Sequence, residues 1–370
     1  MRKKRILLLS EGFGAGHTRA AHALAMLLKQ NSSEIQTRVM ELGAFQHPMV
    51  SSWIFTAYKK TVTSQPKLWG MLYRSQRQKS LNRFAKLALH RLFYSQTQEI
   101  IERFRPDLIV CTHPFPAVIV SRLKRAGLEM PLFTVITDYD GHGAWIDGQV
   151  DKYFVSTNEV KEQLIQKGVP LQRIEVTGIP VHPGFLRQYS KDEIREQYGL
   201  RAMPTVLMMG GGWGMLKNDD LLGRLAEWRE HVQLIIVCGS NEKARQRLLE
   251  GPAFRHPNVH VLGFTQEIDK LMDVSDLLIT KPGGITCTEG MAKGLPMLFY
   301  NPIPGQEEEN CQYFTEQGIG QEITSLDTID QWMEVLLTNY PELARRRRSI
   351  QHRFMSNPVD CSQAIMQYLQ

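Results

Sequence analysis

The sequence is poor in cysteine, and its few cysteines show no sign of a shared role. There are five, an odd number, with no C-x-x-C spacing and no cluster of cysteine with histidine. A disulfide framework and a structural zinc site are therefore not expected. This use of cysteine favours a protein that works in a reducing compartment.

Long apolar runs are also missing. The basic start of the chain is followed by only four apolar residues, 6–9, too few for the core of a signal peptide. No window approaches the roughly 18 apolar residues of a membrane-spanning helix. With 42% hydrophobic residues over 370 positions and a net charge of +6, we expect a soluble or peripheral protein of two domains with an anionic partner.

One segment, 42–98, contains no aspartate or glutamate. It carries nine lysines and arginines with aromatic residues between them. Basic and aromatic side chains together suit the surface of an anionic membrane. The expected membrane contacts are Trp53, Lys59, Lys60, Trp69 and Arg74. Two alternatives stay open: the segment packs its aromatics into its own domain, or it binds single-stranded nucleic acid, although no RNA-binding motif accompanies it.

Short apolar runs alternate with helical stretches along the rest of the chain. The predicted strands are 6–9, 37–40, 108–111, 131–137 and 152–156 in a first series, and 205–209, 233–238, 259–262, 277–280 and 296–300 in a second. A helix is predicted over 17–29. Strands that alternate with helices indicate a parallel sheet, so two series predict two α/β domains. The irregular stretch 177–191 marks the boundary between them.

A glycine-rich turn, 12–16, separates the first strand from the first helix, and His17 follows it. Glycines let the backbone approach a ligand. A nicotinamide enzyme with Glu41 as ribose ligand stays an alternative, although His17 replaces the third glycine of the dinucleotide fingerprint. Because imidazole titrates near neutral pH, His17 could deprotonate a hydroxyl at this edge of the sheet. Taken alone, the histidine is equally explained as a surface or capping residue.

A second glycine-rich turn, 281–286, precedes a helix that carries Glu289. The backbone N–H groups of Gly283 and Gly284 could hold a diphosphate at the start of this helix. Glu289 could accept hydrogen bonds from ribose hydroxyls. The polar residues that follow the next strand, Gln306, Glu307 and Asn310, suit the hydroxyls of a sugar. Each piece alone is also explained as a tight turn with polar caps.

Seven segments together resemble a family of two-domain inverting glycosyltransferases. They are GAGHTRAA from Gly14, THPFP from Thr112, TDYDGHGAW from Thr137, VTGIPV from Val176, GGGWG from Gly210, KPGGITCTE from Lys281 and GQEEEN up to Asn310. The family includes monogalactosyldiacylglycerol synthases, bacterial diacylglycerol glucosyltransferases and the peptidoglycan N-acetylglucosaminyltransferase. The first and third segments resemble the glycerolipid branch more. Trp213 departs from the pattern, because a small or acidic residue is usual there.

The resemblance implies an α/β protein with two Rossmann-like doubly wound domains facing across a cleft, the GT-B type. Residues 1–186 would bind acceptor and membrane, residues 187–345 a UDP-sugar, and 346–370 would pack back as a helical segment. The implied reaction moves glucose or galactose from a UDP-sugar to diacylglycerol, by a peripheral protein at the cytoplasmic face of the cell membrane. Nucleic acid is not an expected partner, and the oligomeric state stays open.

Other readings of the same scaffold also stay open. They are transfer to a polyprenyl or other lipid-linked acceptor, a UDP-sugar 2-epimerase, and a non-catalytic membrane-bound sensor of UDP-sugar.

The resemblance also assigns residues. His17 would be the catalytic base, with Asp138 as a second catalytic group. The expected donor-binding residues are Gly211, Gly212, Gly263, Phe264, Lys281, Pro282, Gly283, Gly284, Ile285, Thr286, Glu289, Gln306, Glu307 and Asn310. The expected acceptor-binding residues are Gly14, Gly16, His113, His142 and Trp145.

No metal or other cofactor is expected for the reaction. The D-x-D string at Asp138 and Asp140 would bind manganese in another glycosyltransferase architecture. Here the helix that follows the turn 281–286 would stabilise the leaving diphosphate instead.

Overall fold

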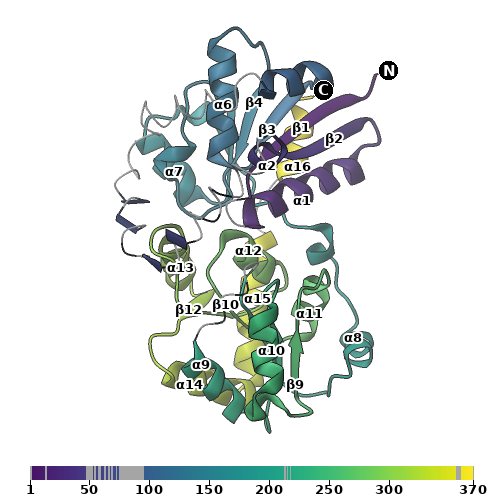
Figure 1. Ribbon diagram of the computed structural model, residues 1–370, viewed down its shortest axis with the longest axis vertical. Coiled ribbons are helices and arrows are strands. Elements are labelled where there is room, and N and C mark those ends of the chain that lie inside the picture. The colour runs from purple at the N-terminus through teal and green to yellow at the C-terminus, as the bar shows by residue number, and fades with distance from the viewer. Residues whose placement is uncertain are drawn as a thin grey trace. The chain divides into compact units, whose positions relative to one another are not determined.

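Figure 1 shows the chain as a computed structural model. The structure describes residues 2–12, 15–46, 53, 56, 60–61, 64–65, 67, 70–71, 73–74, 96–211, 214, 216, 218–355 and 360–369. The chain divides into two compact units. Unit 1 comprises Met1–Pro183, Ile303–Glu309 and Asn357–Gln370, and unit 2 comprises Gly184–Pro302 and Asn310–Ser356.

Unit 1 contains a parallel sheet of six strands in the order β2-β1-β3-β4-β5-β6. The strands are β1 (Lys4–Ser10), β2 (Ile35–Glu41), β3 (Leu108–Cys111), β4 (Leu132–Val135), β5 (Lys152–Val155) and β6 (Ile174–Val176). The described helices of this unit are α1 (Ala15–Asn31), α2 (Leu42–Gln46), α6 (Pro114–Arg125), α7 (Asn158–Gln166) and α16 (Cys361–Gln367), with short 3-10 turns at Gly143–Trp145 and Leu171–Arg173.

Strand β1 is apolar on both faces because helices cover both faces of the sheet. Ile6 and Leu8 share one core with α1 and α16, whereas Leu7 and Leu9 share another with α6 and α7. Alternate residues of a strand point to opposite faces, so a run of four apolar residues serves both cores. This burial fixes β1 in the interior of the sheet, between β2 and β3, and places Glu11 and Gly12 at its carboxyl edge.

Helix α16 comes from the end of the chain and packs beside α1 in unit 1 (Figure 1). Ala364 and Ile365 are fully buried in the core that contains Ile6 and Leu8. The side-chain amide of Asn31 donates a hydrogen bond to Ser362 Oγ at 2.8 Å. The two ends of the sequence therefore contribute to one hydrophobic core.

Unit 2 contains a second parallel sheet of six strands in the order β12-β11-β10-β7-β8-β9. The strands are β7 (Thr205–Met209), β8 (Gln233–Val237), β9 (Val259–Leu262), β10 (Leu277–Thr280), β11 (Met297–Phe299) and β12 (Gly320–Glu322). The described helices between β6 and α16 are α8 (Lys191–Tyr198), α9 (Asp219–Glu227), α10 (Glu242–Glu250), α11 (Ile268–Val274), α12 (Gly284–Ala292), α13 (Gln306–Glu316), α14 (Asp327–Thr338) and α15 (Tyr340–Met355), with 3-10 turns at Pro183–Leu186 and Pro252–Phe254.

The α/β class and the two parallel sheets predicted from the sequence are confirmed. All ten predicted strands are present, with ends shifted by at most two residues. The sequence does not predict β6 or β12, which lie at the edges of the two sheets. Their segments, IEV and GQE, carry too few apolar residues to stand out as buried strands.

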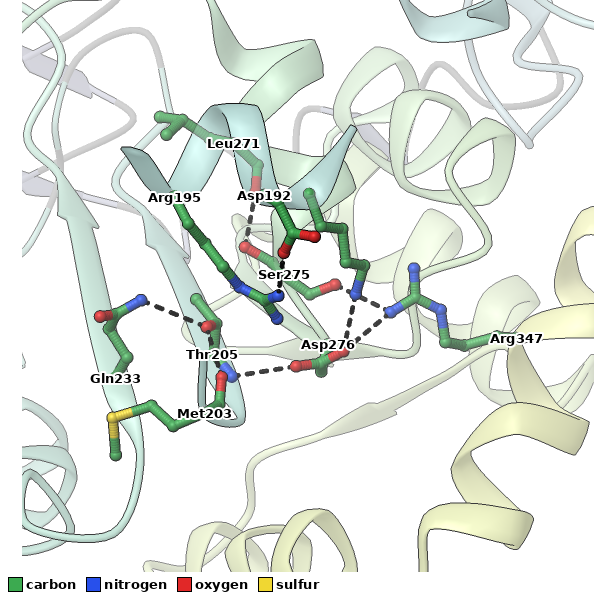
Figure 2. Close-up of polar contacts among 10 residues, drawn as sticks. Asp192, Arg195, Met203, Thr205, Gln233, Leu271, Ser275, Asp276 and Arg347 are labelled. Carbon is green, nitrogen blue, oxygen red and sulfur yellow. Dashed lines mark hydrogen bonds and ion pairs between the residues drawn. The ribbon is translucent and has the colours of Figure 1, made fainter. Parts of the chain in front are cut away.

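Asp276, just before β10, connects three elements of unit 2 (Figure 2). Its carboxylate accepts hydrogen bonds from the backbone N–H of Thr205 at 3.0 Å, from Lys191 Nζ at 3.2 Å and from Arg347 Nη1 at 3.1 Å. Burial lowers the pKa of Lys191, although the charge of Asp276 acts in the opposite direction. The network joins the start of β7 to α8 and α15. It also holds Arg347, one of four consecutive arginines, in a partly buried position.

We predict that Asp276→Ala destabilises unit 2. The change leaves two partly buried cations and one backbone N–H without their shared acceptor, a loss of about 3 kcal/mol. For a unit of this size, the thermal midpoint should fall by about 6–12 °C. Calorimetry measures this shift. Glu227→Ala is the control, because Glu227 pairs with Arg224 at an exposed site and should change the midpoint little. Equal midpoints for the two variants would contradict the prediction.

Candidate active site

His17 is held at the carboxyl edge of the unit 1 sheet by residues that follow two strands. It lies in the first turn of α1, a helix rich in alanine and therefore readily formed. Its Nδ1 is hydrogen-bonded to Thr137 Oγ1 at 2.6 Å, and its carbonyl oxygen accepts a hydrogen bond from Thr112 Oγ1 at 3.0 Å. Thr112 directly follows β3, and Thr137 lies two residues after β4. Both the ring and the backbone of His17 are thus anchored.

The surroundings of His17 keep its imidazole neutral. The ring lies edge-on to His113 at a centroid distance of 4.7 Å and 6.0 Å from the ring of Trp145. The residue retains some exposed surface, yet protein atoms surround the ring closely enough that burial lowers the pKa to about 4. Burial also lowers the pKa of His113 well below its usual range. A neutral imidazole near pH 7 can accept a proton.

Asp138 is buried one residue beyond Thr137. Its carboxylate accepts hydrogen bonds from the side chains of Gln306 and Trp145. Burial raises the pKa to about 6, and the hydrogen bond from Gln306 opposes that rise. Among the described residues, the His17 ring is hydrogen-bonded to Thr137 Oγ1 and to the backbone of Thr112, and not to Asp138. Asp138 therefore holds the side chains of Gln306 and Trp145 by hydrogen bonds and is not hydrogen-bonded to the imidazole.

Two further histidines each cap a helical turn. His113 Nδ1 accepts a hydrogen bond from the backbone N–H of Phe115 at 3.2 Å and caps α6. His142 Nδ1 accepts one from Ala144 at 3.1 Å and caps the turn Gly143–Trp145. The resemblance assigns both histidines to the acceptor, and the structure places His113 directly against His17. These capping hydrogen bonds fix the orientation of both imidazole rings.

Tyr73 contacts Asp140 and His142, and no sequence motif points to it. Its hydroxyl donates to Asp140 Oδ2 at 3.3 Å, and its carbonyl oxygen lies 3.0 Å from His142 Nε2. Its ring lies 4.2 Å from that of His142. Tyr73 comes from the acid-free segment 42–98, where many aromatic residues occur and spacing alone does not single one out.

The glycine turn before His17 is described in part. Gly14 lies outside the described residues, and Gly16 is partly buried in the first turn of α1. Nearby, Glu41 accepts a hydrogen bond from Thr18 Oγ1 at 2.6 Å, and a Cβ on Gly12 would lie 3.3 Å from its carboxylate. Glu41 therefore has a packing partner at the turn, which weakens its reading as a ribose ligand.

In unit 2, the turn that starts at Lys281 leads into α12. Gly283 is the N-cap of this helix, and no side chain caps it. Lys281 Nζ donates to the carbonyl oxygen of Asn301 at 2.7 Å, and the buried Asn310 donates to that of Pro282 at 3.0 Å. The backbone N–H groups at the start of a helix without a side-chain cap can bind an anion.

Other expected donor residues lie around the same sheet. Gly284, Ile285 and Glu289 are buried within α12, and Thr286 is partly buried. Gly263 and Phe264 follow β9, with Phe264 74% exposed. Gly211 has a φ of +68°, and Gly212 and Trp213 lie outside the described residues. A Cβ on Gly214 would lie 1.9 Å from the carbonyl oxygen of Cys238, so only glycine fits this turn.

The start of α13 is grouped with unit 1. Glu307 Oε2 accepts a hydrogen bond from the backbone N–H of Ile303 at 2.7 Å, and Glu308 Oε2 accepts one from that of Gly305 at 2.9 Å. Gln306 contacts Asp138, as described above, while Asn310 belongs to unit 2. The structure therefore brings Gln306 to the Asp138 side chain and Asn310 to the Pro282 turn.

No arrangement for a metal ion is found in the part of the chain that the structure describes, where no three His, Cys, Asp or Glu side chains are grouped suitably. The carboxylate oxygens of the D-x-D string already accept hydrogen bonds from protein groups: those of Asp138 from Gln306 and Trp145, and that of Asp140 from Tyr73. A manganese ion there would have to replace these contacts.

Two family models match the chain. Residues 17–181 match the monogalactosyldiacylglycerol (MGDG) synthase model, and residues 205–351 match the glycosyltransferase family 28 C-terminal domain. The processive diacylglycerol beta-glucosyltransferase of Bacillus licheniformis is 31% identical over 360 residues, covering 96% of this chain and 92% of that protein. The chain belongs to this glycosyltransferase family. The Bacillus pumilus enzyme of the same name is 32% identical over 353 residues, covering 94% and 90%.

Solved structures agree on the fold of this glycosyltransferase. MurG of Acinetobacter baumannii has a TM-score of 0.61 at 14% identity, over 99% of both chains. The Anabaena protein HepE, solved with UDP-glucose, has a TM-score of 0.60 at 15% identity, again over 99% of both chains. The predicted GT-B type of fold is confirmed by these likenesses.

The lowered pKa of His17 predicts how stability depends on pH. As pH falls from about 6.5 to about 4, the unfolded state takes up a proton on this ring before the native state does, so the native state loses stability. His17→Gln removes this loss. The raised pKa of Asp138 acts in the opposite sense but is present in both proteins and cancels in the comparison.

Thermal midpoints of wild type and His17→Gln at about pH 7 and about pH 5 measure the effect. The variant should gain on the wild type at the lower pH. A constant difference between the two proteins across this range would show that His17 keeps an ordinary pKa.

Proposed function

We propose that this glycosyltransferase transfers a hexose from a UDP-sugar to the free hydroxyl of diacylglycerol with inversion at the anomeric carbon. The observation that carries the proposal is the neutral, anchored His17 at the carboxyl edge of the sheet in the half of the chain that matches the MGDG synthase model. The names of the relatives favour glucose over galactose and diacylglycerol over other acceptors.

The proposed step is a single displacement. The acceptor oxygen attacks the anomeric carbon while His17 accepts its proton, the bond between that carbon and the diphosphate oxygen breaks, and UDP leaves with the electron pair. The helix dipole and backbone N–H groups at the start of α12 stabilise the charge that develops on the diphosphate. No metal ion takes part in this proposal.

Donor recognition is proposed for the residues around α12. Glu289 accepts hydrogen bonds from ribose hydroxyls, and Gly284 presents its backbone N–H to the diphosphate. The N–H of Gly283, expected to do the same, donates to the carbonyl oxygen of Lys281 at 2.8 Å and would have to leave it first. Gln306 and Glu307 form hydrogen bonds with the hydroxyl groups of the sugar. The support for this division is the start of α12, which no side chain caps, and the match of residues 205–351 to the glycosyltransferase family 28 C-terminal domain.

Peripheral binding at the cytoplasmic face of the cell membrane is the remaining part of the proposal. Trp53, Met71 and Phe45 are 80%, 65% and 58% exposed, so these apolar side chains are available for insertion into a membrane surface. Lys60 is also exposed. Arg74 forms an ion pair with Glu308 at 3.2 Å, so part of its charge is used within the protein.

Lys59 and Trp69 lie outside the described residues. Among the described residues, no helix is both long and apolar enough to cross a bilayer.

We predict that His17→Ala lowers turnover about 10²–10⁴-fold, the usual contribution of a general base, and leaves UDP affinity unchanged. UDP release with and without diacylglycerol liposomes measures turnover, and calorimetry measures UDP binding. His22→Ala is the control, because His22 is an exposed residue of the same helix. Near-normal turnover in folded His17→Ala would assign the base to another group.

The same assay separates the alternatives. UDP release that does not depend on diacylglycerol would indicate another acceptor, and UDP binding without release would indicate a sensor. Turnover should continue with a strong chelator. Loss on chelation with rescue by manganese would support a metal at the D-x-D string instead.

We predict that replacing Trp53 and Lys60 together with serine weakens flotation with liposomes that contain anionic lipid. Each basic residue near such a surface contributes about 1 kcal/mol, and the aromatic residue adds a part that salt does not screen. Tyr340→Ser with Lys243→Ser is the matched control, since both residues are exposed in unit 2. Unchanged flotation in a double variant with a normal thermal melt would rule out this surface.

A further inference from the structure

The three histidines of the candidate site differ in what their Nδ1 atoms contact. His113 and His142 each accept a hydrogen bond at Nδ1 from a backbone N–H. A backbone N–H only donates, so Nδ1 of both rings carries no proton. His17 Nδ1 instead meets the hydroxyl of Thr137 at 2.6 Å. A hydroxyl both donates and accepts, so this contact allows either neutral tautomer of His17.

The two tautomers have opposite chemical consequences. If Thr137 donates to Nδ1, the ring proton is on Nε2, and neither nitrogen can take a proton from an acceptor. If Nδ1–H donates to Thr137 Oγ1, Nε2 keeps its lone pair. A base in direct contact with an acceptor hydroxyl therefore requires the second arrangement.

We propose that Thr137 is the positioning residue of the catalytic base: its Oγ1 accepts the hydrogen bond from His17 Nδ1–H and leaves the Nε2 lone pair for the acceptor's proton. The proposal rests on the proposed function, in which His17 is the base. Thr137 is suited to this task because it is only 2% exposed and sits just beyond β4. The strand fixes its position, and water does not compete for its hydroxyl.

The choice of a neutral partner fits the low pKa of His17. A carboxylate at Nδ1 would stabilise the imidazolium and raise that pKa. A threonine hydroxyl fixes the ring without adding charge. Thr112 completes the anchoring, because its hydroxyl donates to the backbone carbonyl of His17 and its own backbone is hydrogen-bonded to the ring, which opposes the lowering of the pKa of His17 by burial. Thr137 holds the ring at Nδ1, while Thr112 holds the backbone of His17 and also contacts the ring.

Three variants on the same strand and turn test the proposal by kinetics. Thr137→Val keeps the shape and removes the acceptor, so kcat should fall about 10- to 100-fold with KM nearly unchanged, as expected for a buried donor that loses its partner. Thr137→Ser keeps the oxygen and should restore most of the rate. Thr134→Val is the matched control, because Thr134 is also buried on β4 and its Oγ1 makes no hydrogen bond within the described residues. A normal rate in folded Thr137→Val would overturn the proposal.

Nitrogen-15 NMR of the histidine rings tests the tautomer without any turnover. The His17 signals are assigned by their loss in His17→Gln. In the wild type, Nδ1 should carry the proton and Nε2 should not, and Thr137→Val should lose this preference while Thr134→Val keeps it. A proton on Nε2 of the wild type would overturn the proposal even if no variant folds.

The two tests also separate this proposal from the function on which it rests. An inactive His17→Ala with an unaffected Thr137→Val would leave the proposed function standing and remove Thr137. An active His17→Ala would remove the base, whatever the tautomer.

Discussion

The hydrogen bond between His17 and Thr137 joins the start of α1 to the carboxyl end of β4, and the candidate site is built around it. The sheet of unit 1 makes this contact possible. β1 lies beside β3, and β3 beside β4, in parallel register, so the turns after these strands meet at one edge. The apolar residues of β1 hold that register because they serve both faces of the core. The position of His17 therefore depends on the buried apolar residues of β1, which lie several residues before it in the sequence.

Burial away from water is the main cause of the pKa shifts in the site. It lowers the pKa of His17 and raises that of Asp138, so both side chains tend toward their neutral forms. A neutral imidazole can take a proton from the hydroxyl group of the acceptor. The side chains of Trp145 and Gln306 donate hydrogen bonds to the carboxyl group of Asp138. In unit 2, partial burial disfavours the charged forms of Lys191 and Arg347, and the carboxylate of Asp276 offsets this cost by binding both cations.

The sequence predicts the fold well because apolar runs such as 205–209 are long enough to mark buried strands. His17 and Glu289 stand out in the sequence as candidates because each follows a glycine turn. Thr137, Tyr73 and the ion pair of Arg74 could not. Their partners are more than 60 residues away in sequence, and a threonine or a tyrosine carries no local pattern that names such a partner. Whether His17 acts as the base stays a prediction for the same reason: position suggests it, and only kinetics decides.

The stereochemistry of the product tests the central claim most directly. Purified protein, diacylglycerol liposomes and UDP-glucose or UDP-galactose are incubated, and the lipid product is identified by mass spectrometry and by the anomeric proton in NMR. Because the sugar of the donor is α-linked, single displacement with His17 as base predicts a β-linked hexosyl-diacylglycerol. An α-linked product, or no hexosyl lipid with either donor, would contradict the account.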